Sequence, residues 1–330
     1  MKAMYFGASV LALSLGTLSA GAVFAQDIEL SLGHVLTEDS HYHAAAVKFA
    51  EVLEAKSEGR IKVAIFPSGQ LGGEVKQIQS LRTGTQDLVV TGEAPVENTS
   101  RDYTVFSFPY LFDSVAQANS ILTGPIGREM LDLLDQYDIK GLDFISALER
   151  NVFTNGKRIE TAEDMKGLKI RVIQGPGYVT TYEALGAQPT PMAYSELYMA
   201  MQNGAVDAAE NSPDVFLQDR FVEVSKTYVL SKILYMPALI LMSKSSFNAL
   251  SPEDQALVTE ASAEAAVYAT DFYIEGFDKS MKEIAARGVE IIEPDLETFR
   301  ASRGEVHAKL LEVYPEAKPW LEKIQIQLAK

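Results

Sequence analysis

The sequence has 330 residues, of which 45 are acidic and 29 basic, so its formal net charge at pH 7 is −16. This excess of negative charge repels nucleic acid and anionic lipid and excludes both as general partners, so a binding site for an anion must be built from local cations. The sequence has no cysteine, which excludes disulfides, thiol catalysis and zinc–thiolate sites, and its length allows a packed core to stabilise it instead.

Residues 1–25 are typical of a secretory signal peptide. Lys2 supplies the positive charge, an apolar run extends from about Tyr5 to Leu18, and residues 23–25 form a small-residue cleavage site. The alternative is a membrane anchor, but an anchor needs about 20 consecutive apolar residues, and this run is shorter and interrupted by polar residues. We therefore expect a periplasmic protein that is cleaved after Ala25.

Short strands alternate with amphipathic helices after the signal peptide. Apolar spacing and Gly or Pro at the ends of segments define these elements. Their order indicates right-handed parallel α/β units, and because the pattern restarts near Glu149, we expect an α/β fold with two halves. The predicted strands cover 28–32, 61–66, 87–90, 169–173 and 205–210, and the predicted helices cover 46–59, 74–84 and 195–204.

Residues 251–288 predict one long helix. Ser251 is a suitable N-cap, Pro252 suits the first helical position, and Gly288 follows the end. At 1.5 Å per residue such a helix is roughly 50 Å long, which exceeds a small domain, so we expect it to cross both halves. Gly276 leaves the alternative of two helices with a break between them.

Arg171 is a charged residue inside an otherwise apolar strand. Strand periodicity places Arg171 and Ile173 on the face opposite Ile170 and Val172, just before residues 175–177, a Gly-Pro-Gly turn. Ligands of open parallel sheets bind beyond the carboxyl ends of the strands. A buried guanidinium needs a carboxylate, and its planar donors match one through two parallel hydrogen bonds. That carboxylate belongs either to the protein or to a ligand.

Other polar candidates each have a structural alternative. Asn211 follows a strand end but is also an ordinary turn residue next to proline. Arg150 is either a site residue or a surface arginine, and Tyr194 belongs either to a pocket or to the core. Glu93 follows the third strand, where it either accepts hydrogen bonds from ligand hydroxyls or is simply exposed.

Two kinds of chemistry lack support in the sequence. His34, His41 and His43 cluster near the first strand, but without cysteine they favour structural or solvated roles over a metal site, and we expect no metal or cofactor. Motifs of serine hydrolases, P-loop proteins, dinucleotide-binding proteins and zinc proteases are missing. We therefore expect a binding protein and not an enzyme.

Five stretches in order resemble the solute-binding proteins of TRAP transporters (tripartite ATP-independent periplasmic transporters, DctP type). These stretches cover nearly the whole chain after the signal peptide. They are KFAEVLEAKSEGRIKVAIFPSGQLGGE, FPYLF, EDMKGLKIRV, GAQPTPMAYSELYMAMQNGAVDAAENSP and the long helix after LSPEDQ.

The resemblance implies a two-lobed periplasmic-binding-protein fold with a long hinge-spanning helix and an acidic ligand clamped between the lobes. Lobe I then comprises residues 26–148 plus 237–276, and lobe II residues 149–236 plus 277–330. Residues 233–242 form one of three crossings between the lobes.

The resemblance also implies roles for single residues. Arg171, in GLKIRV, matches the arginine that holds the ligand carboxylate, and Arg150 matches a second arginine, although the segment after it carries one extra residue relative to sialic-acid-binding members. Asn211 and Tyr194 match the family's asparagine and aromatic positions, and acidic residues near the second and third strands lie where members differ. The expected ligand contacts are Arg171, Arg150, Asn211, Tyr194, Glu93, Glu74 and His34.

The expected function is the capture of a small organic acid anion and its delivery to TRAP membrane subunits by a monomer. The pattern is most similar to sugar-acid-binding members, which favours a hexuronate, and a C4-dicarboxylate or another organic acid is the alternative ligand. The alternative functions are a periplasmic lyase or hydrolase that uses Glu93 and a histidine, and a ligand-sensing protein.

Overall fold

A computed structural model describes residues 27–330, so the expected signal peptide lies outside the described residues. Within this range nine strands form one mixed sheet in the order β2-β1-β3-β8-β4-β7-β5-β6, and β9 pairs with β8. The strands are β1 (Ile28–Gly33), β2 (Ile61–Phe66), β3 (Leu88–Gly92), β4 (Ile139–Thr154), β5 (Lys169–Val172), β6 (Gln188–Pro191), β7 (Ala208–Asn211), β8 (Thr227–Ser243) and β9 (Glu290–Ile292).

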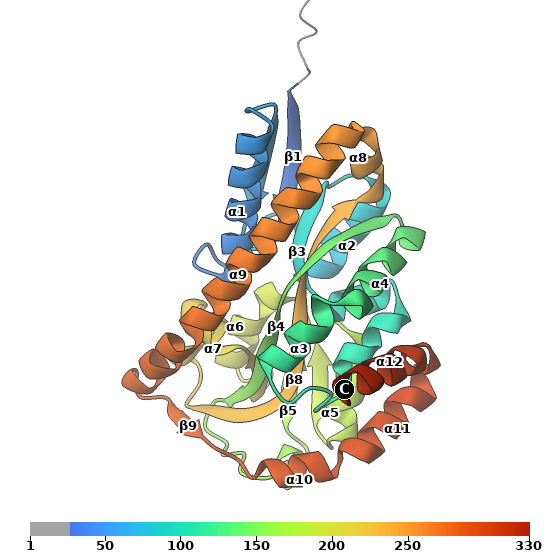
Figure 1. The fold of residues 1–330 in the computed structure, drawn as a ribbon. Coiled ribbons are helices and arrows are strands. Elements are labelled where there is room, and N and C mark those ends of the chain that lie inside the picture. Colours follow the sequence, from blue (N-terminus) through green and yellow to red (C-terminus); the bar gives the residue numbers. More distant parts are fainter. Residues whose placement is uncertain (1–26) are drawn as a thin grey trace, which may run out of the picture.

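Helices cover both ends of this sheet (Figure 1). The α-helices are α1 (His41–Lys56), α2 (Glu74–Thr83), α3 (Val115–Leu122), α4 (Pro125–Leu133), α5 (Pro176–Ala184), α6 (Tyr194–Gln202), α7 (Pro213–Gln218), α8 (Lys244–Ala249), α9 (Pro252–Ala286), α10 (Leu296–Ala301), α11 (Arg303–Val313) and α12 (Lys318–Leu328). The short 3₁₀ helices are η1 (Ala94–Asn98), η2 (Arg101–Ser107), η3 (Leu134–Tyr137), η4 (Ala162–Met165), η5 (Phe221–Glu223) and η6 (Pro315–Ala317). None of the helices in residues 27–330 is both long and apolar enough to span a membrane.

The two predicted α/β halves are confirmed. In the first half β1 pairs in parallel with β2 and β3, and in the second β5 pairs in parallel with β6 and β7. Several boundaries differ from the prediction, most of them by one to three residues, and α1 begins at His41 instead of residue 46. Strand β7 begins at Ala208, and α6 begins at Tyr194 because the Glu196 carboxylate accepts a hydrogen bond from the Ala193 N–H, so Ser195 is not the N-cap.

Two long antiparallel strands, β4 and β8, join the halves. They have 16 and 17 residues, and β8 pairs with β3 of the first half while β4 pairs with β7 of the second. Residues 233–242, predicted as a crossing, are part of β8. The predicted lobe boundaries fall at Leu148 and Met236, which face each other in the ladder. Irregular register on both sides of this pair bends the strands between the halves.

Helix α9 is one continuous helix of 35 residues, as predicted, and it runs through Gly276 without a break. It lies beside α1 and crosses β4 diagonally (Figure 1). The Thr270 hydroxyl donates to the Ile145 carbonyl oxygen of β4, and the Glu149 N–H donates to the Tyr273 hydroxyl over 2.9 Å. The helix is therefore attached to β4 where that strand passes between the halves.

The C-terminal helices contact both halves. Trp320 Nε1 donates to Asp102 Oδ1 over 2.8 Å in the first half, and Lys323 Nζ lies 2.5 Å from Glu129 Oε1. The Tyr314 hydroxyl lies 3.3 Å from Thr180 Oγ1 in the second half. The assignment of residues 277–330 to lobe II stays a prediction.

Replacing Gly276 with alanine should raise the free energy of unfolding by about 0.5–1 kcal/mol, because glycine is unfavourable inside a helix. A Cβ at this position meets no atom within 4 Å. The matched control is Gly288→Ala just after the same helix, where φ is +80° and the substitution should destabilise. Urea titration followed by circular dichroism measures both changes. A loss of stability in Gly276→Ala would contradict an unbroken, unstrained helix.

Candidate ligand-binding site

A small cavity lies between the two halves of the sheet. Its volume is about 20 Å³, which is room for one water molecule. Residues of both halves line it, and they include five of the seven predicted ligand contacts: Arg171, Arg150, Asn211, Tyr194 and Glu74. Because these five lie far apart in the sequence, their convergence is a product of the fold.

Arg171 is 1% exposed and lies on β5. Its Nε and Nη2 donate to the Met192 carbonyl oxygen over 3.3 and 3.0 Å, whereas Nη1 has no hydrogen-bond partner within residues 27–330. No carboxylate in this described range forms an ion pair with it; the guanidinium carbon lies 5.7 Å from the centre of the Tyr194 ring. Burial lowers the pKa of Arg171. The side chain is therefore a buried cation that the protein does not neutralise.

Arg150 is also buried, but the protein neutralises it. Its Nε and Nη2 bind the two carboxylate oxygens of Glu210 over 2.5 and 3.0 Å, and Nη1 donates to Asn211 Oδ1 over 2.5 Å. Burial alone would lower the pKa of Arg150, but Glu210 raises it above its usual value. Arg150 is therefore not a surface arginine, and its bidentate partner is part of the protein. A direct contact between Arg150 and a ligand stays a prediction.

Sequence reasoning missed Glu210. The only signal for it was an acidic residue inside AAEN, the four-residue buried strand β7. That signal could not identify the partner, because Arg150 is 60 positions away and reaches Glu210 through the pairing of β4 with β7.

Tyr194 takes part in a chain of hydrogen bonds between the halves. Its hydroxyl donates to one carboxylate oxygen of Asp219, which follows α7. The other oxygen accepts a hydrogen bond from Thr37 Oγ1, in the loop after β1, over 2.8 Å. The aromatic ring is thereby fixed beside Arg171, and the second half is linked to the first.

Glu74 brings a carboxylate to the cavity from the first half. It is the first residue of α2, and its Oε1 accepts hydrogen bonds from the Gly92 N–H and from Thr91 Oγ1, each over 3.1 Å. Burial raises the pKa of Glu74 above its usual value. The cavity thus combines a cation from one half of the sheet with a carboxylate from the other.

The remaining two predicted contacts, Glu93 and His34, are fully buried and are not among the residues that line the cavity. Neither carboxylate oxygen of Glu93 has a hydrogen-bond partner within residues 27–330, and burial followed by repulsion from Glu97 raises its pKa well above the usual value. His34 Nε2 lies 3.1 Å from His43 Nδ1, and burial lowers the pKa of His34 to about 3. A direct ligand contact by either residue stays a prediction.

A buried pair between the halves, His41 and Asp214, was also missed. His41 Nδ1 lies 2.7 Å from Asp214 Oδ2, and His41 lines the cavity. Burial alone would raise the pKa of Asp214, but the attraction of His41 lowers it below the usual value. Nothing in the sequence distinguishes His41 from His34 and His43 except its place directly after Ser40, the N-cap of α1.

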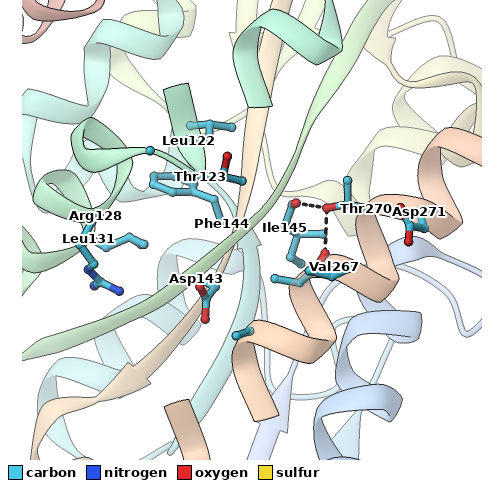
Figure 2. A pocket seen from close by; sticks show the side chains of 13 residues that line it. Leu122, Thr123, Arg128, Leu131, Asp143, Phe144, Ile145, Val267, Thr270 and Asp271 are labelled. Atoms are coloured by element: carbon cyan, nitrogen blue, oxygen red, sulfur yellow. Dashed lines mark hydrogen bonds between the residues drawn. The ribbon is translucent and has the colours of Figure 1, made fainter. Parts of the chain in front are cut away.

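A larger cavity of about 310 Å³ lies between α9, β4 and the segment that joins α3 to α4. Figure 2 shows its mainly apolar wall and the hydrogen bonds of Thr270. Arg128 lines it, but the guanidinium already donates to the carbonyl oxygens of Leu142 and Gly141 over 2.9 and 2.7 Å. Because this cavity offers no unneutralised buried cation, the small cavity at Arg171 is the better candidate site for an anion.

Comparisons with known proteins show the family of this chain. The family model of the bacterial extracellular solute-binding proteins, family 7 (DctP), matches residues 32–313. A solute-binding protein of Roseobacter denitrificans is 30% identical over 311 residues, which cover 94% of each chain. The 2,3-diketo-L-gulonate-binding periplasmic protein YiaO of Escherichia coli is 30% identical over 84% of each chain.

Solved structures are similar over nearly their whole length. The sugar acid binding protein DctPAm of Advenella mimigardefordensis, in complex with galactonate, has a TM-score of 0.88 and 28% identity and covers 92% of this chain and 98% of its own. A TRAP periplasmic solute-binding protein of Sulfitobacter sp. NAS-14.1 with bound β-D-galacturonate has a TM-score of 0.86 and 31% identity, covering 89% and 98%. The two-lobed fold, the family match and these similarities together show that the chain belongs to the DctP family of TRAP-type extracellular solute-binding proteins.

Proposed function

We propose that this protein binds a monocarboxylic sugar acid between its lobes in the periplasm and delivers it to the membrane subunits of a TRAP transporter. The observation that carries the proposal is the buried, unneutralised guanidinium of Arg171. A ligand carboxylate supplies the missing negative charge and an acceptor for Nη1. This function needs an anchor for the ligand and no catalytic group, so we propose a binding protein and not an enzyme.

Glu74 supports a sugar acid over a C4-dicarboxylate. Ligand hydroxyls can donate hydrogen bonds to its carboxylate, whereas a second ligand carboxylate would be repelled by it. Two relatives are named as C4-dicarboxylate-binding, from Bacillus subtilis and Rhodobacter capsulatus, and they are 26% and 27% identical. Several similar structures instead hold galactonate, galacturonate or glucuronate. A ligand with one carboxylate and several hydroxyls fits the charges of this cavity best.

The size of the cavity implies a clamp. A space for one water molecule does not admit a sugar acid, so the walls must separate for binding. Arg171 and Tyr194 belong to the second half, whereas Glu74 and His41 belong to the first, so a ligand that contacts both groups stabilises the closed form. We propose that the protein acts as a monomer, because these residues complete the site without a second copy. The bent strands β4 and β8 are the natural hinge.

Arg171→Lys should weaken the binding of galacturonate or galactonate by roughly 10- to 100-fold, the range expected when a charged hydrogen bond is lost. The reason is that an ammonium group cannot keep the Met192 contact and also hold a carboxylate in two-point fashion. Isothermal titration calorimetry measures the affinity. Arg158→Lys is the control, because Arg158 is exposed and does not line the cavity, so this variant should bind with the wild-type affinity. Near-normal binding by Arg171→Lys would refute the proposed role.

A thermal-shift screen should show that galacturonate, glucuronate and galactonate stabilise the protein increasingly above their dissociation constants. Succinate should stabilise it less, because its second carboxylate meets Glu74. Glu74→Gln should reduce the difference in stabilisation between the sugar acids and succinate. The amide can still form hydrogen bonds with hydroxyls, but it carries no charge that repels a second carboxylate.

A response confined to uncharged sugars would contradict an anion site, and a wild-type preference for succinate would contradict the role of Glu74. The bound acid, recovered after long incubation, should be chemically unchanged, as a binding protein requires. A converted product would favour the alternative of a lyase or hydrolase.

A further inference from the structure

His41 has one ring nitrogen whose role the fold does not explain. The side chain is fully buried and lines the same cavity as Arg171. Its Nδ1 pairs with Asp214 at 2.7 Å, but Nε2 has no hydrogen-bond partner within residues 27–330. A buried polar nitrogen without a partner costs free energy, so its position beside a ligand cavity points to a ligand atom.

The pair also connects the two halves of the molecule. His41 begins α1 in the first half, and Asp214 lies in α7 of the second, 173 positions later. The imidazole packs edge-on against Tyr42 and against Tyr273 of α9, with interplanar angles of 86° and 63° and ring centres 4.8 and 5.6 Å away. These contacts hold the ring plane, and the pairing of Nδ1 with Asp214 leaves Nε2 as the ring nitrogen without a partner among residues 27–330. The orientation of His41 therefore depends on the approach of the lobes.

We propose that His41, held by Asp214, contacts a hydroxyl group of the bound sugar acid through Nε2 when the lobes close. This inference rests on the proposed function and adds a specificity-determining residue to the site. It also gives Asp214 a positioning role, because Asp214 acts on the ligand only through His41.

Hydrogen-bond chemistry selects a hydroxyl as the partner. An imidazole that donates from Nδ1 to a carboxylate has a lone pair at Nε2 when neutral and an N–H there when protonated. A hydroxyl both donates and accepts, so it pairs with either form, whereas a ligand carboxylate pairs only with the protonated form. In the proposed function, the Arg171 guanidinium already binds the ligand carboxylate. His41 is thus suited to the hydroxylated part of the ligand.

A double-mutant cycle between His41 and the ligand tests the proposal. Wild type and His41→Phe, which keeps an aromatic ring between Tyr42 and Tyr273, are titrated by calorimetry with galacturonate and its single deoxy derivatives. We expect His41→Phe to bind galacturonate about 10-fold more weakly. For one deoxy derivative the same substitution should cost less than about 2-fold, because the contact is already absent. A merely structural role would weaken all ligands equally.

Three further measurements keep the test independent of how well one variant folds. His41→Gln should recover part of the affinity, since its amide can bond a hydroxyl. Asp214→Asn should reduce the discrimination between galacturonate and the same deoxy derivative. In ¹⁵N spectra of the wild type, the Nε2 signal of His41 should shift on addition of galacturonate. His43→Gln is the matched control on the same helix, and because His43 does not line the cavity, its affinity should equal that of wild type.

The outcomes separate this inference from the proposed function. If galacturonate and galactonate do not bind the wild type, both ideas are overturned. If they bind, but His41→Phe loses equal affinity for every derivative or none at all, and the His41 signal does not move, the proposed function stands and the His41 contact is refuted. Non-additive losses confined to one hydroxyl, together with the shifted signal, establish the contact.

Discussion

The positive charge of Arg171 is buried beside a second arginine, and the arrangement of the cleft follows from how the protein treats these two charges. Glu210 neutralises Arg150 through two hydrogen bonds, and Asn211 binds the same guanidinium. Arg171 receives only a carbonyl oxygen and an aromatic ring. Arg150 is therefore part of the internal ion pairing of the site, whereas Arg171 keeps a positive charge that an anion can neutralise. Without Glu210, two unneutralised arginines would repel each other inside the second half.

The polar groups of the cavity are divided between the lobes by chemical kind. The second half contributes the cation and the aromatic ring, and the first contributes the Glu74 carboxylate and the His41 imidazole. A ligand that carries a carboxylate at one end and hydroxyls along the rest complements both halves at once. Recognition and closure are thus the same event, since neither half alone satisfies such a ligand.

Local sequence patterns predicted the parts of this protein whose causes are local. The strand with Arg171, the helix caps at Ser251 and Pro252, and the two α/β halves follow from periodicity and from preferences at helix ends. The resemblance to the family predicted that Arg150 and Asn211 lie at the cleft. The continuous strands β4 and β8 were not predicted, because strands buried on both faces lack alternation. Likewise, the Arg150–Glu210 and His41–Asp214 pairs depend on packing between distant segments, which periodicity does not record.

The small volume of the cavity also has a kinetic meaning. Because the walls of the cavity leave room for little more than one water molecule, a ligand of the proposed size would leave only when the lobes separate. The dissociation rate would then have an upper limit set by the frequency of opening, which depends on the bends of β4 and β8 and on the attachment of β4 to α9. Residence time is then a property of the hinge as much as of the residues that touch the ligand.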